Sequence, residues 1–144
     1  LAAALRKIGV NAELAPSDWA GVAARRQKKG PIEEDGWSMF CSSESDSSHA
    51  NPHTNVSMAA NGDKAWYGWP KFDEYEALRA KWADIDTLEQ RRELARKMQK
   101  VYWDNVGTVL LGQFFQPIAR RKSLTGLIGI PEVVPMWNMQ KASA

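Results

Sequence analysis

The N-terminal part of the chain changes its hydrophobic period twice. Apolar residues recur at helical spacing over positions 1–8, and Gly9 stands where a helix ends in a left-handed cap. Residues 10–14 then alternate apolar with polar, as a half-buried strand does, and Pro16 ends the alternation. This pattern predicts a short helix followed by a strand.

A second helix and a second strand are expected next. Ser17 or Asp18 is a suitable N-cap for a helix to about Lys29, whose basic end suits the negative end of the helix dipole. Gly and Pro at 30–31 end this helix, and residues 37–41 predict another strand. Helix, strand, helix and strand with short links are typical of an α/β layer with parallel strands.

Residues 42–61 interrupt this rhythm with a polar, serine-rich loop. A long polar loop after the carboxyl end of a strand is where open α/β sheets place ligand sites. The adjoining residues 61–70, NGDKAWYGWP, hold three aromatic residues and nothing that looks catalytic. For Trp66 and Trp69, a lid or pocket wall and a packing plug are equally good interpretations. The segment favours a protein that holds a ligand.

Two amphipathic helices follow, and then an apolar run. Apolar residues recur at helical spacing over residues 71–83, and again over about four turns after Thr87, which forms a capping-box pattern with Gln90. Residues 109–115 predict a buried strand. From Leu124 onward the periodicity is lost, so we expect extended chain that lies on another surface.

The composition is that of an ordinary soluble globular protein. Apolar residues make up 44% and charged residues 25% of 144 residues, enough for one domain or part of one. The basic clusters at 25–29 and 120–122 are short, which favours solvated helix ends over a nucleic-acid site. Cys41 is the only cysteine, so no internal disulfide forms. No apolar run approaches the roughly 20 residues that span a bilayer.

Catalytic and cofactor chemistry is weakly indicated. No glycine-rich phosphate loop precedes a helix, and His49 and His53 flank a proline without further ligands, which favours loop histidines over a metal site. The loop serines outnumber any evident catalytic partners. Glu44 and Asp46 are either solvated acids, an acid/base pair, or carboxylates that meet a ligand amine. For Trp19, Trp82 and Trp103, which lie in helical patterns, core packing is the favoured interpretation: each has apolar companions.

Several segments together resemble one protein family. They are LRKIGVNAEL at 5–14, the aromatic segment at 60–70, Tyr-Trp at 102–103, LLGQFFQP at 110–117 and Leu-Thr-Gly at 124–126. In this order they are similar to the extracytoplasmic solute-binding proteins of ABC importers in the dipeptide, oligopeptide and nickel class (family 5). The resemblance covers nearly the whole chain, as the C-terminal third of a longer protein. Residues 1–8 agree with this, because they lack an initiator Met and read as a helix already under way.

The resemblance implies an α/β fold with two lobes that close on a ligand. The chain would supply part of the second lobe of this type II periplasmic-binding-protein fold, with a helix pair and a C-terminal return strand. The expected parts are a helix-strand-helix-strand unit at 1–42, a polar and aromatic loop at 43–70, the helix pair at 71–104, and the return strand and tail at 105–144.

One departure from the family concerns ligand specificity. After the second strand the family has a Gly-Trp pair and then an Asp that meets the amino terminus of a peptide ligand, whereas this chain has CSSESDS at 41–47. Glu44 stands near the Trp position, with Asp46 or Ser47 near the Asp position. The resemblance therefore implies either a peptide or a different small polar solute.

The predicted function is solute capture for an ABC importer, in the periplasm, without catalysis or a cofactor. The partners implied are the ligand and a membrane permease, and no nucleic acid. We expect the exposed apolar surface around residues 114–115 to cause dimerisation or exchange of the C-terminal segment. The predicted ligand-binding residues are Ser43, Glu44, Asp46, Asn51, Trp66 and Trp69, the last three as cleft walls.

Two alternatives remain open at this point. The first is a small hydrolase that uses Glu44 or Asp46 with a serine or histidine of the same loop. The second is an interaction module that has no small ligand. Turnover of a substrate would distinguish the hydrolase from a solute-binding protein. The interaction module predicts that Trp66→Ala and Glu44→Ala leave ligand affinity unchanged, whereas a solute-binding protein predicts a loss.

Overall fold

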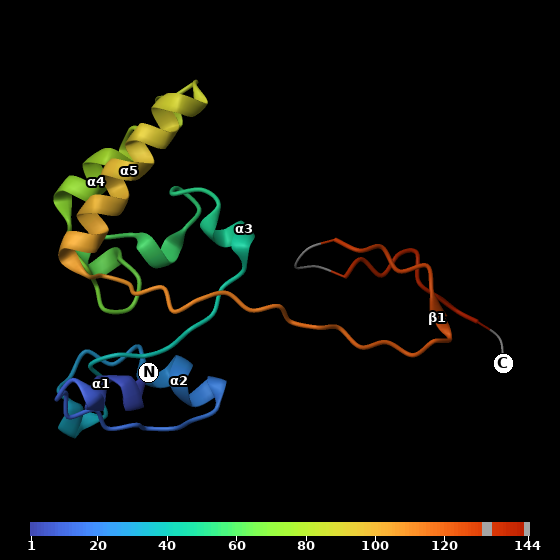
Figure 1. The fold of residues 1–144 in the computed structure, drawn as a ribbon, viewed down its shortest axis with the longest axis horizontal. Coiled ribbons are helices and arrows are strands. Elements are labelled where there is room, and N and C mark those ends of the chain that lie inside the picture. The colour runs from blue at the N-terminus through green and yellow to red at the C-terminus, as the bar shows by residue number, and fades with distance from the viewer. Residues whose placement is uncertain (131–133, 143–144) are drawn as a thin grey trace.

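A computed structural model describes residues 1–130 and 134–142, which form a helical body and a long arm (Figure 1). The α-helices are α1 (Ala2–Lys7), α2 (Trp19–Arg25), α3 (Asp46–His49), α4 (Asp73–Ala80) and α5 (Leu88–Asn105), and the 3-10 turns are η1 (Ile32–Glu34), η2 (Val56–Met58), η3 (Gly62–Lys64) and η4 (Trp82–Asp84). The strands are β1 (Leu124–Thr125) and β2 (Gln140–Lys141).

The core lies between α4 and α5. Tyr75 of α4 is only 1% exposed, and its ring meets that of Tyr102 of α5 edge to face, with centroids 4.8 Å apart. Phe72 meets the same Tyr102 ring at 5.6 Å. The buried residues of this core are Ala60, Tyr75, Leu94, Met98, Val101 and Tyr102. Both predicted amphipathic helices are thus confirmed, and their apolar faces pack on each other.

Local capping rules place the helix ends. After α1, Gly9 takes a φ of +89°, and the amides of Gly9 and Val10 donate to the carbonyls of Arg6 and Leu5, which is a Schellman cap. The amide of Gly21 donates to Asp18 Oδ1 at 2.8 Å, so Asp18 is the N-cap of α2. This helix ends at Arg25, four residues earlier than predicted.

The strand predictions for 10–14, 37–41 and 109–115 are wrong. Within residues 1–130 and 134–142, the only sheet is the antiparallel pair of β1 and β2, in which Leu124 faces Lys141. A strand needs a partner for its backbone, and none of these three segments lies beside another extended segment in the register of a ladder. The described chain is α/β only in the coarse sense of helices with one small sheet.

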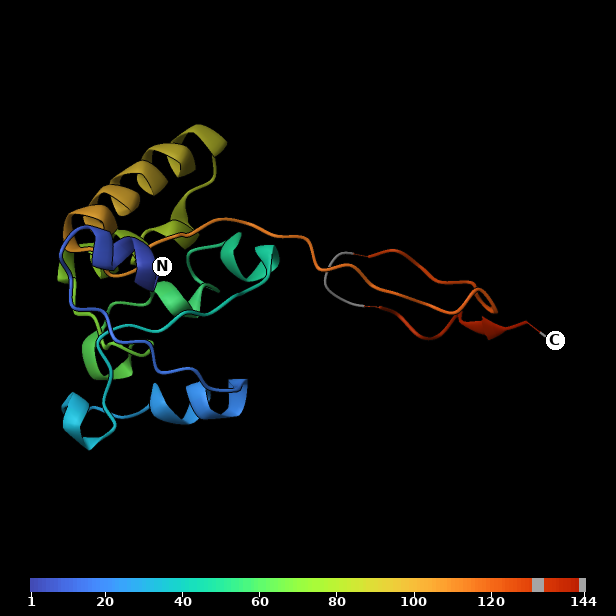
Figure 2. The same cartoon turned by 60° about the horizontal axis from the view of Figure 1, so that its bottom comes forward.

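The arm leaves the body after α5 and folds back on itself far from the helices (Figures 1 and 2). Residues 107–120 are extended, and Phe115 is fully exposed. The tail from Leu124 was expected to lie on another surface, but the part that the structure describes instead turns back to pair β2 with β1. Residues 131–133 and 143–144 of that prediction lie outside the described residues.

The tryptophan predictions have mixed outcomes. Trp82 is partly buried and packs against the core, as expected. The core predictions for Trp19 and Trp103 are wrong, because these side chains are 57% and 75% exposed. Trp103 lies next to the buried Tyr102 on α5, on the side of the helix that turns away from α4.

Candidate functional site

The aromatic segment 61–70 forms a closed loop. The amide of Gly62 donates to the carbonyl of Pro70 at 2.9 Å, and the amide of Trp69 donates to the carbonyl of Trp66 at 2.9 Å. Trp69 takes a φ of +49°, in the left-handed region that non-glycine residues seldom adopt. This turn places Trp66, Tyr67 and Trp69 in one short loop, in which the Trp66 and Tyr67 rings are in contact.

A second stretch of chain packs against this loop. Trp37 meets Phe40 edge to face at 4.9 Å and meets Trp69 at 6.3 Å, and Phe40 meets Tyr67 at 6.4 Å. Trp66 and Tyr67 complete the cluster at 5.0 Å. Trp37 and Phe40 of the predicted strand at 37–41 therefore place their partly buried rings in an aromatic cluster instead of joining a sheet.

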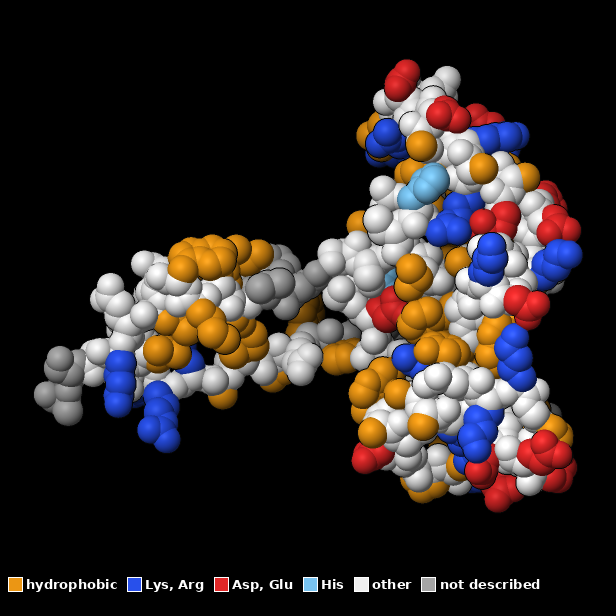
Figure 3. Space-filling model, turned by 180° about the vertical axis from the view of Figure 1, so that it is seen from behind, with side chains coloured by type: hydrophobic (Ala, Val, Ile, Leu, Met, Phe, Trp, Pro, Cys, Tyr) orange, Lys and Arg blue, Asp and Glu red, His pale blue; other side chains and the backbone are white. Residues whose placement is uncertain are grey.

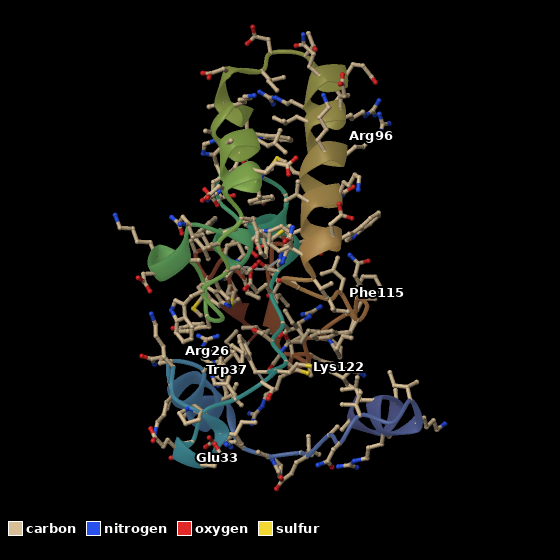
Figure 4. All side chains as sticks on the ribbon, turned by 90° about the vertical axis from the view of Figure 1, so that its left-hand side faces the viewer. Arg26, Glu33, Trp37, Arg96, Phe115 and Lys122 are labelled. Atoms are coloured by element: carbon tan, nitrogen blue, oxygen red, sulfur yellow. The ribbon has the colours of Figure 1, made fainter. Side chains whose placement is uncertain are left out.

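Two cations from the end of α2 lie over these rings. The guanidinium carbon of Arg26 is 5.1 Å from the Trp19 ring centroid, 5.0 Å from that of Trp66 and 4.3 Å from that of Tyr67. Trp37 Nε1 donates to the backbone carbonyl of Arg26 at 3.1 Å, and the two residues lie side by side below the helix pair (Figure 4).

Lys29 anchors the other edge of the loop. Its Nζ lies 4.5 Å from the Trp69 ring centroid and 2.9 Å from Asp63 Oδ1. The hydrogen bond and positive charge of Lys29 lower the pKa of Asp63 below its usual value. Since Asp63 is exposed, this ion pair fixes a position more than it stabilises the fold.

A hollow of about 320 Å³ opens beside the Arg26 guanidinium. Its lining combines two indoles, one cation, one carboxylate and several hydroxyls, which is a mixture suited to a small polar ligand. The lining residues are Trp19, Arg26, Ser42, Ser43, Glu44, Ser45, Ser48, Val56 and Trp66.

Glu44 is the carboxylate of this hollow. Its side chain is 21% exposed, and its Oε2 accepts from Ser48 Oγ at 3.4 Å and lies 3.9 Å from His49 Nε2. Ser48 Oγ also donates to the carbonyl of Ser45 at 2.8 Å. The short helix α3 therefore holds Glu44 at the rim, where a cationic group can approach it.

The structure brings together three of the six predicted ligand-binding residues. Ser43, Glu44 and Trp66 all line the hollow, although they come from two separate segments of the chain. Their convergence needs the loop after residue 41 to pass beside the aromatic loop. The sequence interpretation did not specify this approach.

The other three predicted residues lie outside that lining. Asp46 begins α3, and its Oδ1 accepts from Gln113 Nε2 at 3.4 Å. Asn51 closes its own turn, with Oδ1 accepting from the His53 amide at 2.9 Å. Trp69 lines a second, wider hollow of about 720 Å³ with Asn61, Gly62, Asp63, Lys64 and Lys71.

Sequence reasoning missed the contribution of α2 to the hollow. Trp19 was assigned to the core and Arg26 to a solvated helix end, yet both line the site. They are seven residues apart, which is close to two helical turns, so they share one face of α2. The sequence signal that could have identified Trp19 and Arg26 was this spacing, together with the two tryptophans at 66 and 69, for which the sequence assigned no packing partner.

The described residues hold neither a metal-binding cluster nor a membrane-spanning helix. Among residues 1–130 and 134–142, no three His, Cys, Asp or Glu side chains are grouped closely enough to hold a metal ion. In the same residues, no helix has the length and apolar character required to cross a membrane.

Comparison with known proteins gives one strong match. The chain is 58% identical over 143 residues to the "Probable peptide ABC transporter periplasmic-binding protein" of Sinorhizobium fredii. The match covers 99% of this chain and 27% of that protein, so the chain spans about a quarter of the length of the relative. No family model matches the chain. The resemblance identified from the sequence motifs is confirmed by this identity.

Proposed function

Because the chain is homologous to the periplasmic-binding proteins of ABC transporters, we propose that it forms part of the ligand-binding component of an import system. This component captures a peptide or another small polar solute and delivers it to a membrane permease. The proposal includes a periplasmic location and a role without catalysis.

The observation that carries the proposal is the identity of 58% along 99% of the chain. The hollow supports it independently, because it combines apolar walls with convergent polar groups. Ser43, Glu44 and Trp66 are the proposed ligand contacts within it. Glu44 engages a cationic group of the solute, and Trp66 covers its apolar surface.

Three further residues stay predictions of ligand contact. Asp46, Asn51 and Trp69 do not line the same hollow as Glu44. In a two-lobe protein, side chains from the second lobe contribute only one wall of the cleft. We propose that the chain supplies such a wall, with its helix pair behind it and its C-terminal arm leading to other parts of the protein.

The arm also supports the proposal of self-association. Its exposed hydrophobic side chains recur over residues 109–118, with glycine, glutamine and proline between them, and hydrophobic surface is visible along the arm (Figure 3). They are Val109, Leu110, Leu111, Phe114, Phe115 and Ile118. We propose that this run is covered in solution by a second copy of the chain or by its exchanged C-terminal segment.

One arrangement favours the hydrolase alternative. Ser48 Oγ lies 3.3 Å from His49 Nδ1, and His49 Nε2 lies 3.9 Å from Glu44 Oε2, which is the order of a nucleophile, a base and an acid. The geometry is poor for catalysis, because Ser48 donates to the carbonyl of Ser45 and the acid is beyond hydrogen-bond distance of the histidine. Solute binding is therefore the better-supported function.

Native mass spectrometry of the chain with a mixture of short peptides tests this proposal. We expect wild type to retain intact peptides and Glu44→Gln to retain about tenfold less, because a charge-assisted contact is lost. Glu33→Gln is the matched control, since Glu33 lies on η1, away from the hollow. Peptides cleaved in the presence of wild type but not of Glu44→Gln would support the hydrolase. Absence of any retained peptide would contradict peptide binding by this part of the protein.

A further inference from the structure

Among the described residues, no carboxylate serves as a counter-ion for the guanidinium of Arg26. Its Nε is buried and lacks a hydrogen-bond partner, and no ion pair joins Arg26 to any carboxylate among the described residues. Arg26 as a whole is partly buried, and a partly desolvated charge without a partner is stabilised by an anion that approaches it.

The neighbouring cations are satisfied in other ways. Arg25 Nε donates to the backbone carbonyl of Asp35 at 3.1 Å. Lys28 pairs with the Asp35 carboxylate at 3.2 Å, and Lys29 pairs with Asp63. Arg26 therefore differs from the three other basic residues at this end of α2, although all four belong to one short basic cluster in the sequence.

The aromatic rings leave the binding edge of Arg26 available. The guanidinium carbon of Arg26 lies over the rings of Trp19, Trp66 and Tyr67, and these cation–π contacts offer no hydrogen-bond acceptor to its N–H groups. The N–H donors of a guanidinium lie in its plane, in a fork that matches a carboxylate. A cage of rings therefore fixes the position of Arg26 without using its in-plane donors.

We propose that Arg26 is the anion-binding residue of the hollow and that it holds a ligand carboxylate. This inference rests on the proposed function and adds a substrate class to it. Glu44 lines the same hollow, so a ligand bound by both residues carries a cationic and an anionic group. A singly charged carboxylate fits beside Glu44 better than a phosphate, since the second charge of a phosphate is repelled by Glu44. The ligand class is a small zwitterion, such as an unmodified short peptide or an amino acid.

The site itself is tested with simple anions. In the ¹⁵N-labelled chain, sodium acetate should shift the Arg26 Nε–H resonance saturably, and Arg26→Gln identifies that resonance by its loss. The Arg25 resonance is the internal control, because its Nε already donates to backbone carbonyls. Inorganic phosphate should shift the Arg26 resonance less than acetate, and sodium chloride at equal ionic strength should not shift it. Equal shifts of both arginines, or no saturable shift of Arg26, would overturn the proposal.

The ligand class is tested with three forms of one peptide. Calorimetry should give tighter binding for trialanine than for its C-terminal amide or its N-acetyl form. Arg26→Gln should weaken trialanine binding about tenfold, to the level of the amide, because a charge-assisted pair is lost. Arg26→Lys, which keeps the charge but not the fork, should lie between them.

The outcomes separate this inference from the proposed function. An acetate shift without any binding of trialanine keeps the anion site and contradicts peptide capture. Trialanine binding that Arg26→Gln leaves unchanged keeps the proposed function and overturns the role of Arg26. Equal affinity for trialanine and its amide also overturns it.

Discussion

At the scale of single residues, Tyr102 makes two opposing contributions to the stability of the fold. Its ring packs against Tyr75 and Phe72 in the core, but its hydroxyl is buried without a hydrogen-bond partner in the described structure. Tyr102→Phe keeps the ring and removes the unpaired hydroxyl. We expect this change to leave the free energy of unfolding unchanged or to raise it by about 1 kcal/mol. Urea denaturation followed by circular dichroism measures this, and a loss above about 1 kcal/mol would contradict it.

The same residue predicts a dependence of stability on alkaline pH. Burial raises the pKa of Tyr102 far above its usual value of 10.0, and burial also raises that of Tyr75. The folded chain therefore holds these protons more tightly than the unfolded chain. The resulting stability is complete below about pH 10 and is lost as the pH rises towards the raised pKa. Melting temperatures between pH 8 and about 11.5 should fall less steeply in Tyr102→Phe than in wild type.

The residues of the candidate site were only partly predictable. Ser43, Glu44 and Trp66 were predicted from their position in the loop that follows the expected strand and from the family resemblance, and the structure brings them to one hollow. Trp19 and Arg26 were missed because, considered alone, a tryptophan in a helical pattern is explained by core packing and an arginine in a basic cluster by a solvated helix end. Only the approach of α2 to the aromatic loop gives them a shared environment, and such long-range approaches are not encoded in local spacing.

At the scale of elements, Thr87 determines where the longest helix begins. Its Oγ1 accepts from the Gln90 amide at 3.3 Å, and its hydroxyl lies 3.0 Å from Gln90 Oε1, so the predicted capping box is present in part. Thr87→Ala should lower the free energy of unfolding by about 1 kcal/mol, because one amide of α5 loses its partner. Thermal denaturation of the two variants measures this loss. Thr108→Ala is the control, because Thr108 is exposed on the arm and the same substitution there removes no helix cap.

Helices were predicted better than strands for a physical reason. The caps at Gly9, Asp18 and Thr87 are formed by residues within a few positions of each other, so the sequence specifies them directly. The predicted strands at 37–41 and 109–115 needed neighbours from distant segments, and the described chain offers none. Without such a neighbour, the apolar residues of 109–115 stay exposed in the described chain, although the sequence predicted a buried strand there.

At the scale of the whole molecule, the apolar arm predicts self-association. Phe115→Asp places a charge in the exposed run of hydrophobic side chains and should shift the chain towards monomer. Sedimentation equilibrium over a wide concentration range measures this change. Leu14→Asp is the matched control, because Leu14 is similarly exposed but lies outside the arm. A wild-type chain that stays monomeric throughout would contradict the proposal.

The extended connection between body and arm has a consequence for proteolysis. Residues 107–120 expose two consecutive phenylalanines, and the hydrogen bonds of the described residues 121–130 and 134–142 all have their partners within residues 120–130 and 134–142. Extended, exposed chain fits readily into a protease active site, which binds substrates as strands. At a dilution at which the chain is monomeric, brief chymotrypsin treatment should therefore cut first at Phe114 or Phe115, before any site in α4 or α5. The larger product should keep its helical signal, and the C-terminal peptide should separate from it on a sizing column.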